Sequence, residues 1–183
     1  MDPQSTGQAD LNNDTVVNVA ALLREQTGAT RSYRFEIDRF PLDVDLEATS
    51  LSGDLQLTRL SDAILVSVSG NASVDLQCQR CLRQFLLPVP VAFSEQFRIA
   101  YDVRRGTAIE SGVEGIDERP EISENHELDF SEPLRQEILV TLPMRPICGP
   151  DCPGPPAFAE SGEDEESGQF STLASLLAQS DEE

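Results

Sequence analysis

A long stretch of two-residue periodicity constrains the fold of this chain more than any other feature. Ile64, Val66 and Val68, for example, alternate with Ser67 and Ser69. This period is typical of a β-strand with one buried face and one hydrated face. Strands are therefore predicted in four segments: Tyr33–Ile37, Leu51–Thr58, Ala63–Leu76 and Leu86–Ile99.

Short polar or glycine-containing links are predicted to be the turns between these strands. The links are Gly53, Ser61–Asp62 and Gly70–Asn71. Consecutive strands with links this short pair antiparallel, because a parallel pair needs a crossover of a dozen or so residues. We therefore expect an antiparallel sheet or a partly closed barrel.

A short helix is predicted before the strands. Asp14 has the character of an N-cap, apolar residues recur at helical spacing from Val16 to Leu23, and Gly28 follows the end.

A second helix is predicted to begin at Ser131 as its N-cap, with Pro133 in its first turn. Its apolar stripe comprises Leu134, Ile138 and Leu139. Glu127–Phe130 can form a short strand before it. The expected fold class is thus α+β: an antiparallel strand-rich body with a short N-terminal helix and a helix after Ser131.

The length of 183 residues suits a single domain. Residues 1–14 are expected to be a disordered head, residues 15–154 the domain, and residues 155–183 an acidic linker with a short helix. A glycine-rich acidic segment, 106–125, is expected to be a mobile loop inside the domain. The terminal helix would use four apolar residues: Phe170, Leu173, Leu176 and Leu177.

Composition excludes several classes of function. All 13 basic residues are arginine, which excludes enzymes that depend on a lysine, such as P-loop and Schiff-base enzymes. No apolar run approaches the roughly 18 residues of a membrane span, and the polar, acidic beginning lacks a secretory-signal layout. We expect a cytoplasmic protein that acts without a membrane. No catalytic residue is predicted, because His126 has no nucleophile in a recognisable setting.

Two cysteine pairs carry the strongest chemical signal in the chain. Cys78 and Cys81 form a C-x2-C pair after a predicted strand, and Cys148 and Cys152 form a C-x3-C pair among Gly and Pro residues. Two short pairs are a common way to supply the four thiolates of a tetrahedral zinc site. We predict that these four cysteines bind a structural zinc ion.

Three alternatives to structural zinc stay open. The cysteines can be inert thiols that lie apart, since cysteine is often a small buried apolar residue. They can be redox-active, although such a pair normally begins a helix, whereas Pro88 and Pro90 follow Cys81 closely. A metal-dependent hydrolase or nuclease is the third alternative, and an all-thiolate site disfavours it because no coordination position stays open.

The net charge of −20 is unevenly distributed along the chain. Residues 31–105 hold nine arginines against ten acidic residues, a net charge of −1, so the excess acid lies elsewhere. The segment Leu76–Ser94 contains no acid at all. We predict that Arg80 and Arg83, which can grip phosphate, and Phe85, which can stack on a base, bind RNA or another partner. The structural alternative is that Phe85 belongs to the core and the arginines only solubilise the surface.

Several segments together resemble the YceD-like family of large-ribosomal-RNA accumulation proteins. They are Asn18–Glu25, Leu76–Phe85 with the first cysteine pair, Leu128–Pro143, and Pro146–Cys152 with the second pair. In that family further cysteines usually follow the second pair, whereas none follows Cys152 here. The resemblance therefore implies either a site reduced to these four cysteines or no metal site.

The resemblance implies a non-enzymatic accessory factor in ribosome biogenesis. Such a factor would support accumulation or processing of large-subunit ribosomal RNA by binding that RNA or a large-subunit ribosomal protein, with no small-molecule substrate. The alternative is an acidic adaptor or chaperone that holds a basic ribosomal protein and does not contact RNA. The large negative charge suits this alternative.

Overall fold

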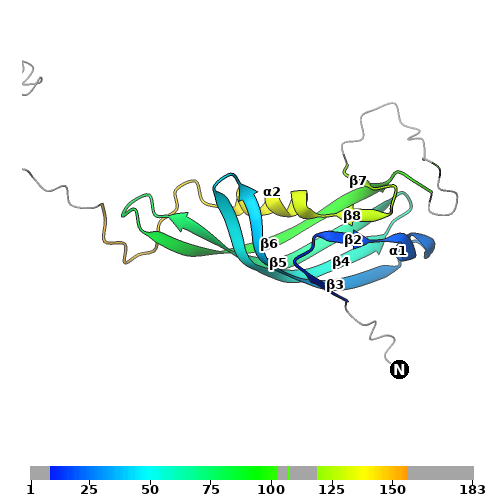
Figure 1. The fold of residues 1–183 in the computed structure, drawn as a ribbon, viewed down its shortest axis with the longest axis horizontal. Coiled ribbons are helices and arrows are strands. Elements are labelled where there is room, and N and C mark those ends of the chain that lie inside the picture. Colours follow the sequence, from blue (N-terminus) through cyan, green and yellow to red (C-terminus); the bar gives the residue numbers. More distant parts are fainter. Residues whose placement is uncertain (1–8, 103–106, 108–118, 156–183) are drawn as a thin grey trace, which may run out of the picture.

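The computed structural model describes residues 9–102, 107 and 119–155, and strands dominate it (Figure 1). Strands hold 54% of the described residues and helices 12%. In chain order the elements are β1 (Ala9–Asn12), β2 (Val16–Asn18), α1 (Ala20–Arg24), β3 (Thr30–Asp43), β4 (Leu46–Arg59), β5 (Ala63–Gln77), β6 (Gln84–Ile99), β7 (Glu121–Ile122), β8 (Glu127–Asp129) and α2 (Ser131–Thr141).

Six strands form one curled sheet in the order β1-β3-β4-β5-β6-β7. The links between the four long strands β3 to β6 are residues 44–45, 60–62 and 78–83, and these strands pair antiparallel, as predicted. The edge strands do not, because β1 runs parallel to β3 and β7 runs parallel to β6. The strands β2 and β8 form a separate antiparallel pair.

The predicted α+β class with a purely antiparallel body is therefore wrong: the protein is strand-dominated and its main sheet is mixed. Both parallel edges come from segments that were expected to be a disordered head and a mobile loop. Ala9–Asn12 and Glu121–Ile122 are too short to show a two-residue period, so they carried no strand signal.

The predicted N-terminal helix exists, but it is shorter than predicted and has a different cap. Only Ala20–Arg24 is helical, and Val16–Asn18 is a strand in which Val17 pairs with Leu128 of β8. The cap is not Asp14, whose carboxylate instead accepts a hydrogen bond from the Val16 N–H. The spacing of these apolar residues fits a buried strand followed by a one-turn helix as well as it fits one continuous helix.

Gly53 and Gly70 are not turns, in contrast to the prediction. They lie in the middle of β4 and β5, directly opposite one another. A Cβ added to Gly70 would lie 2.3 Å from the Ser52 carbonyl oxygen, and one added to Gly53 would lie 2.9 Å from the Phe35 ring. The two glycines therefore allow the strands and an aromatic ring to approach closely.

The hydrophobic core lies between one face of the curled sheet and α2, which packs against that face (Figure 1). Leu134 and Ile138 of α2 are fully buried, as predicted, and each contributes roughly 1.5–3 kcal/mol of burial free energy. Phe130, just before α2, meets Phe35 of β3 edge to face with ring centroids 5.7 Å apart. The helix is thereby fixed in position over the sheet.

The start of α2 differs from the prediction by one residue. Phe130 is the N-cap residue, and Ser131 is the first helical residue, whose N–H donates to the Asp129 carboxylate. Arg135 donates to Glu132 one turn earlier and to the Leu42 carbonyl oxygen of β3. α2 is thus attached to the sheet by a polar contact as well as by its apolar face.

The remaining predictions about order lie outside the described residues. These concern the head up to residue 8, most of the 106–125 loop, and the C-terminal linker and helix from residue 156 onward. Among the helices in the described ranges, none has the length and apolar character that crossing a membrane requires.

Candidate metal centre

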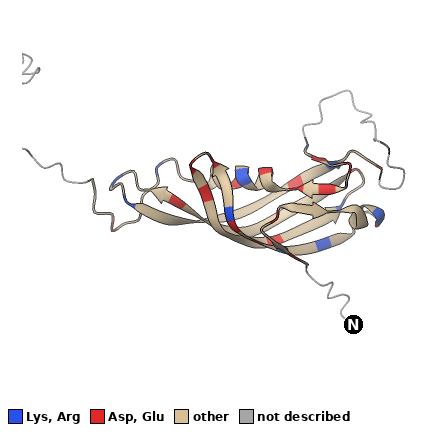
Figure 2. Ribbon diagram, viewed as in Figure 1, with Lys and Arg blue, Asp and Glu red and all other residues tan. Residues whose placement is uncertain are grey.

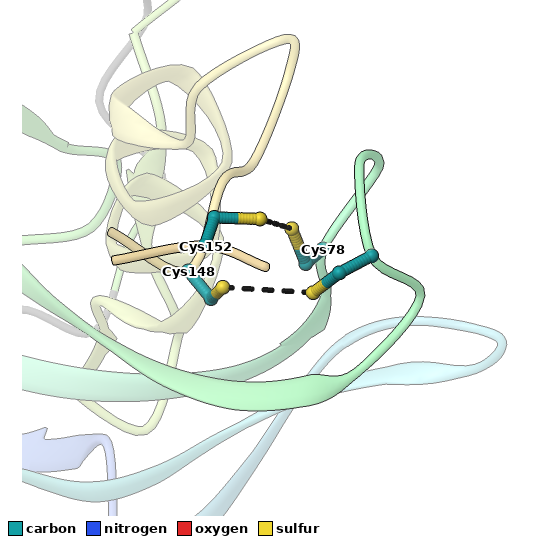
Figure 3. Close-up of side chains that lie close together, drawn as sticks. Cys78, Cys148 and Cys152 are labelled. Carbon is teal, nitrogen blue, oxygen red and sulfur yellow. Dashed lines mark hydrogen bonds between the residues drawn. The ribbon is translucent and has the colours of Figure 1, made fainter. Parts of the chain in front are cut away.

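The two cysteine pairs lie on separate parts of the fold that meet at one end of the molecule. Cys78 and Cys81 belong to the connection between β5 and β6, at the end of that long hairpin (Figure 1). Cys148 and Cys152 belong to the segment after α2, which returns toward the hairpin. The close-up in Figure 3 shows the sulfurs of the two segments pointing toward each other.

A tight backbone turn positions the first pair. The Cys78 N–H donates to the Arg83 carbonyl oxygen at 2.9 Å, and the Leu82 N–H donates to the Cys78 carbonyl oxygen at 2.9 Å. Leu82 closes the turn in the left-handed region, with φ of 61°. A non-glycine residue adopts this conformation only when its surroundings require it, so the turn is well specified.

Hydrogen bonds from Gln79 hold the two cysteine segments together. Its N–H donates to the Pro146 carbonyl oxygen at 2.9 Å, and its side-chain amide donates to the Met144 carbonyl oxygen at 3.4 Å. In the second segment the Cys152 N–H donates to the Gly149 carbonyl oxygen, and Gly149 has φ of 138°. The segments are therefore joined by their backbones and not only by their sulfurs.

The four sulfurs form a compact group. The Sγ atoms of Cys78 and Cys152 are 3.8 Å apart, those of Cys81 and Cys148 are 3.6 Å apart, and all four lie within 4.8 Å of one another. Zinc–sulfur bonds of about 2.3 Å in a tetrahedron place the sulfurs about 3.8 Å apart. These separations are far too long for a disulfide, whose sulfurs are about 2.05 Å apart. The spacing therefore fits a four-coordinate metal ion.

The electrostatics of the cluster favour a bound cation. Burial raises the pKa of Cys78, but N–H groups of Cys81, Cys148 and Arg80 donate to its sulfur and lower the pKa to about 6. Burial and the neighbouring sulfurs raise the pKa of Cys148 to about 12. One thiolate is thus stabilised by the backbone, and further thiolates beside it require a positive ion.

A closed set of four sulfurs fits a structural metal rather than a catalytic one. Four cysteine ligands complete the tetrahedron and leave no position for water or substrate. The interpretation in which the four cysteines lie apart is wrong, because the fold brings them together. The first pair lies between two strands and not at the start of a helix, which removes the geometry of a typical redox pair.

Exposed arginines surround the cluster. Arg80 and Arg83 of the cysteine turn and Arg145 of the segment after α2 are all exposed. Figure 2 shows basic positions in blue on both segments at this end of the molecule. Phe85, the third predicted binding residue, is half-buried and stands opposite Leu76 in the hairpin. Sequence reasoning missed Arg145, although the stretch from Leu142 to Pro150 also contains no acidic residue and carried the same signal.

The arginines near the cluster differ from the others in their partners. Six of the eleven arginines in the described residues form ion pairs there. Arg59 donates to the Leu60 and Ala63 carbonyl oxygens. The four whose side chains have no hydrogen bond or ion pair within the described ranges are Arg24, Arg80, Arg83 and Arg145, and three of these surround the cysteines.

The fold and the site together define a strand-built domain with a four-cysteine centre that fits a metal ion. The family described as "Large ribosomal RNA subunit accumulation protein YceD" matches residues 66–178, which include all four cysteines. The chain belongs to this family. Its description connects the family with accumulation of large ribosomal subunit RNA.

Similar proteins of known sequence add no further function. Uncharacterized proteins of Mycobacterium bovis and Mycobacterium tuberculosis are 30% identical over 103 residues, which is 55% of this chain and 45% of theirs. An uncharacterized protein of Mycobacterium leprae is 29% identical over 105 residues, 55% of this chain and 43% of its own. The chain thus spans less than half the length of these relatives. No solved structure matches it.

Proposed function

We propose that this protein is a non-enzymatic accessory factor in ribosome biogenesis that binds large-subunit ribosomal RNA through the arginines around its cysteine cluster. The observation that carries the proposal is the placement of Arg80, Arg83 and Arg145. They lie on two segments joined by hydrogen bonds, and none has an ion-pair partner among the described residues. Unpaired guanidinium groups on a rigid frame are ready to bind phosphate bidentately.

Zinc is the metal that we propose for the cluster. Thiolates are soft ligands, and four of them in a tetrahedron are typical of structural zinc. When bound, zinc would join the hairpin to the segment after α2 and hold the arginines in position. Because the centre is closed, we propose no reaction at it. Phe85 is proposed as a stacking residue beside Arg83.

Charge reversal of the two turn arginines tests the RNA proposal. The double variant R80E/R83E should lower the affinity of the full chain for large-subunit ribosomal RNA and reduce the salt slope of binding by about 2. R24E is the matched control, because Arg24 is exposed and also unpaired within the described ranges but lies in α1. Equal binding by R80E/R83E and R24E would refute the role of these arginines.

Zinc content should be measured on both variants in parallel. A zinc ion with four thiolates carries a net charge of −2, which Arg80 and Arg83 would partly offset, so loss of RNA binding could follow loss of metal. Loss of RNA affinity with unchanged zinc content is the result that supports direct contact.

A second candidate is an adaptor for a basic large-subunit ribosomal protein. The observation that favours it is the charge of −20, nearly all of it outside residues 31–105. Capture of purified basic ribosomal proteins, compared with naked ribosomal RNA at several salt concentrations, separates the two functions. The adaptor predicts protein capture that the R80E/R83E change leaves intact.

A further inference from the structure

One end of the molecule combines exposed arginines with exposed apolar side chains. The end of the β5–β6 hairpin and the segment after α2 contribute six such residues, which we call the tip surface: Arg80, Leu82, Arg83, Met144, Arg145 and Ile147. The exposed fractions of Leu82, Met144 and Ile147 are 56%, 98% and 51%. Such a combination is typical of a surface that a partner covers.

The tip surface has little acid of its own. No acidic residue occurs from Leu76 to Ser94, and Asp151 is the only one from residue 142 to 155. The apolar side chains are concentrated there too, since only three other large apolar residues of the described ranges are exposed, Val44, Leu86 and Val140. An occupant should therefore carry both negative charge and spaced apolar side chains.

The C-terminal part of this same chain has that composition. Residues 156–183 contain eight acidic residues and no arginine, and four of the acids are consecutive from Glu163 to Glu166. Apolar residues then recur at helical spacing from Phe170 to Leu177. We propose that this acidic tail, residues 156–183, docks on the tip surface of its own chain and covers the arginines.

The attachment point makes the contact possible within one chain. Pro155 lies three residues after Cys152, so the tail begins beside the tip surface. Seven residues separate Pro155 from Glu163, and an extended chain of that length spans up to about 25 Å. A short tether of this kind gives an effective concentration in the millimolar range, so a weak contact is sufficient.

Docking of the tail has a consequence that rests on the proposed function. If the tip surface binds RNA, the tail competes with RNA for the same arginines. An occupancy of about nine-tenths by the tail would weaken the apparent RNA affinity about tenfold. RNA that offers several phosphates displaces the tail, whereas isolated or short anions do not. The tail would thus restrict binding to extended RNA.

Docking can be measured without RNA, because the chain contains no tryptophan. In full-length F170W the single indole reports on the tail. We expect blue-shifted emission at low salt that moves toward that of a solvated indole at about 0.5 M salt, where the screening length is roughly 4 Å. R80E/R83E in this background should remove the shift, and R24E should keep it. Solvated emission at low salt would overturn the proposal.

A second variant tests the tail without touching the folded part. Full-length E163Q/D164N/E165Q/E166Q in the F170W background should also lose the blue shift, and a shift that survives both sets of changes would overturn electrostatic docking. The shift should not depend on protein concentration. A shift that grows with concentration would show that the tail of a second copy occupies the surface, which contradicts docking within one chain.

The RNA arm distinguishes failure of this inference from failure of the proposed function. The E163Q/D164N/E165Q/E166Q variant should bind large-subunit ribosomal RNA about tenfold more tightly than the unmodified chain. If neither protein binds RNA while the emission shift is present, the proposed function fails and docking stands. If R80E/R83E abolishes RNA binding while F170W itself shows no blue shift at low salt, docking fails and the proposed function stands.

Discussion

Replacement of Gly70 with alanine tests whether the close approach of β4 and β5 is as tight as the structure shows. The added Cβ would lie 2.3 Å from the Ser52 carbonyl oxygen and 2.9 Å from the Gly53 Cα. Both atoms belong to the backbone, so no side-chain rotation relieves the contact. The two strands must separate locally by about 1 Å, because heavy atoms of this kind rest roughly 3.5 Å apart or more.

The expected loss of stability follows from the contacts that are disrupted when β4 and β5 move apart. Two ladder hydrogen bonds beside the glycine pair contribute about 1 kcal/mol each, and overpacking of a fitted site costs roughly 1–3 kcal/mol. Alanine also lowers the conformational entropy of the unfolded chain, which offsets this loss by about 0.4–1 kcal/mol. We therefore expect G70A to lower the free energy of unfolding by about 2–5 kcal/mol, with the slope against denaturant unchanged.

Urea denaturation followed by circular dichroism measures this free energy. S69A is the matched control, because Ser69 is the preceding residue of the same strand, is exposed and has no described side-chain hydrogen bond. Its effect should stay within about 0.5 kcal/mol. A G70A effect below about 1 kcal/mol would refute the proposed packing of the glycine pair.

Three further predictions concern the core, the pH dependence and the metal. L134A should lower the free energy of unfolding by about 2–5 kcal/mol in the same urea assay, since Leu134 is fully buried on the core-facing side of α2. Hydrogen bonds from Arg135 and Gln136 lower the pKa of Glu132 from its usual 4.5 to about 2, so its stabilising contribution is complete above pH 4.5 and is lost as the pH falls toward 2. Acid titration of E132Q should show a smaller loss of stability across that window, and an unchanged titration would contradict this assignment. Elemental analysis of the protein purified from cells should find about one zinc per chain and much less in C152S; less than about a third of an equivalent in the unmodified protein, with four titratable thiols, would refute the zinc centre.

The long strands could be predicted because their physical signal is local. The burial pattern alternates along β5 and β6 and, with one interruption each, along β3 and β4. All four strands were predicted from that period, although most ends extend further than predicted. The second helix was found for the same reason, since Leu134 and Ile138 lie on one face. A strong period therefore predicts that a strand or helix exists more reliably than it predicts where that element begins and ends.

The features that escaped prediction depend on partners distant in sequence. The short strands β1 and β7 exist because they pair with β3 and β6, which no local pattern indicates. Glycine is typical of turns, so Gly53 and Gly70 were predicted to be turns. Only their position opposite each other in β4 and β5 explains why glycine is needed there. In these cases tertiary contacts overrode local preference.

The candidate site could be predicted in part. The spacing of the four cysteines was sufficient to propose one cluster, and the fold places them together. Arg145 was missed because it becomes a neighbour of the cysteine turn only through the Gln79 hydrogen bonds to Met144 and Pro146. The sequence shows Arg145 and the lack of acidic residues around it, but it does not show that this segment contacts the cysteine turn.

Ultraviolet cross-linking in cells, followed by identification of the cross-linked peptides, determines whether the arginines around the cysteine cluster contact ribosomal RNA. If the arginines around the cysteines bind RNA, large-subunit ribosomal RNA should be attached to peptides that contain Arg80 to Phe85 or the stretch from Leu142 to Pro150. These cross-links should be strongly reduced in R80E/R83E and not in R24E. Recovery of the protein with basic ribosomal proteins alone, and no RNA on either peptide, would contradict RNA binding by these arginines.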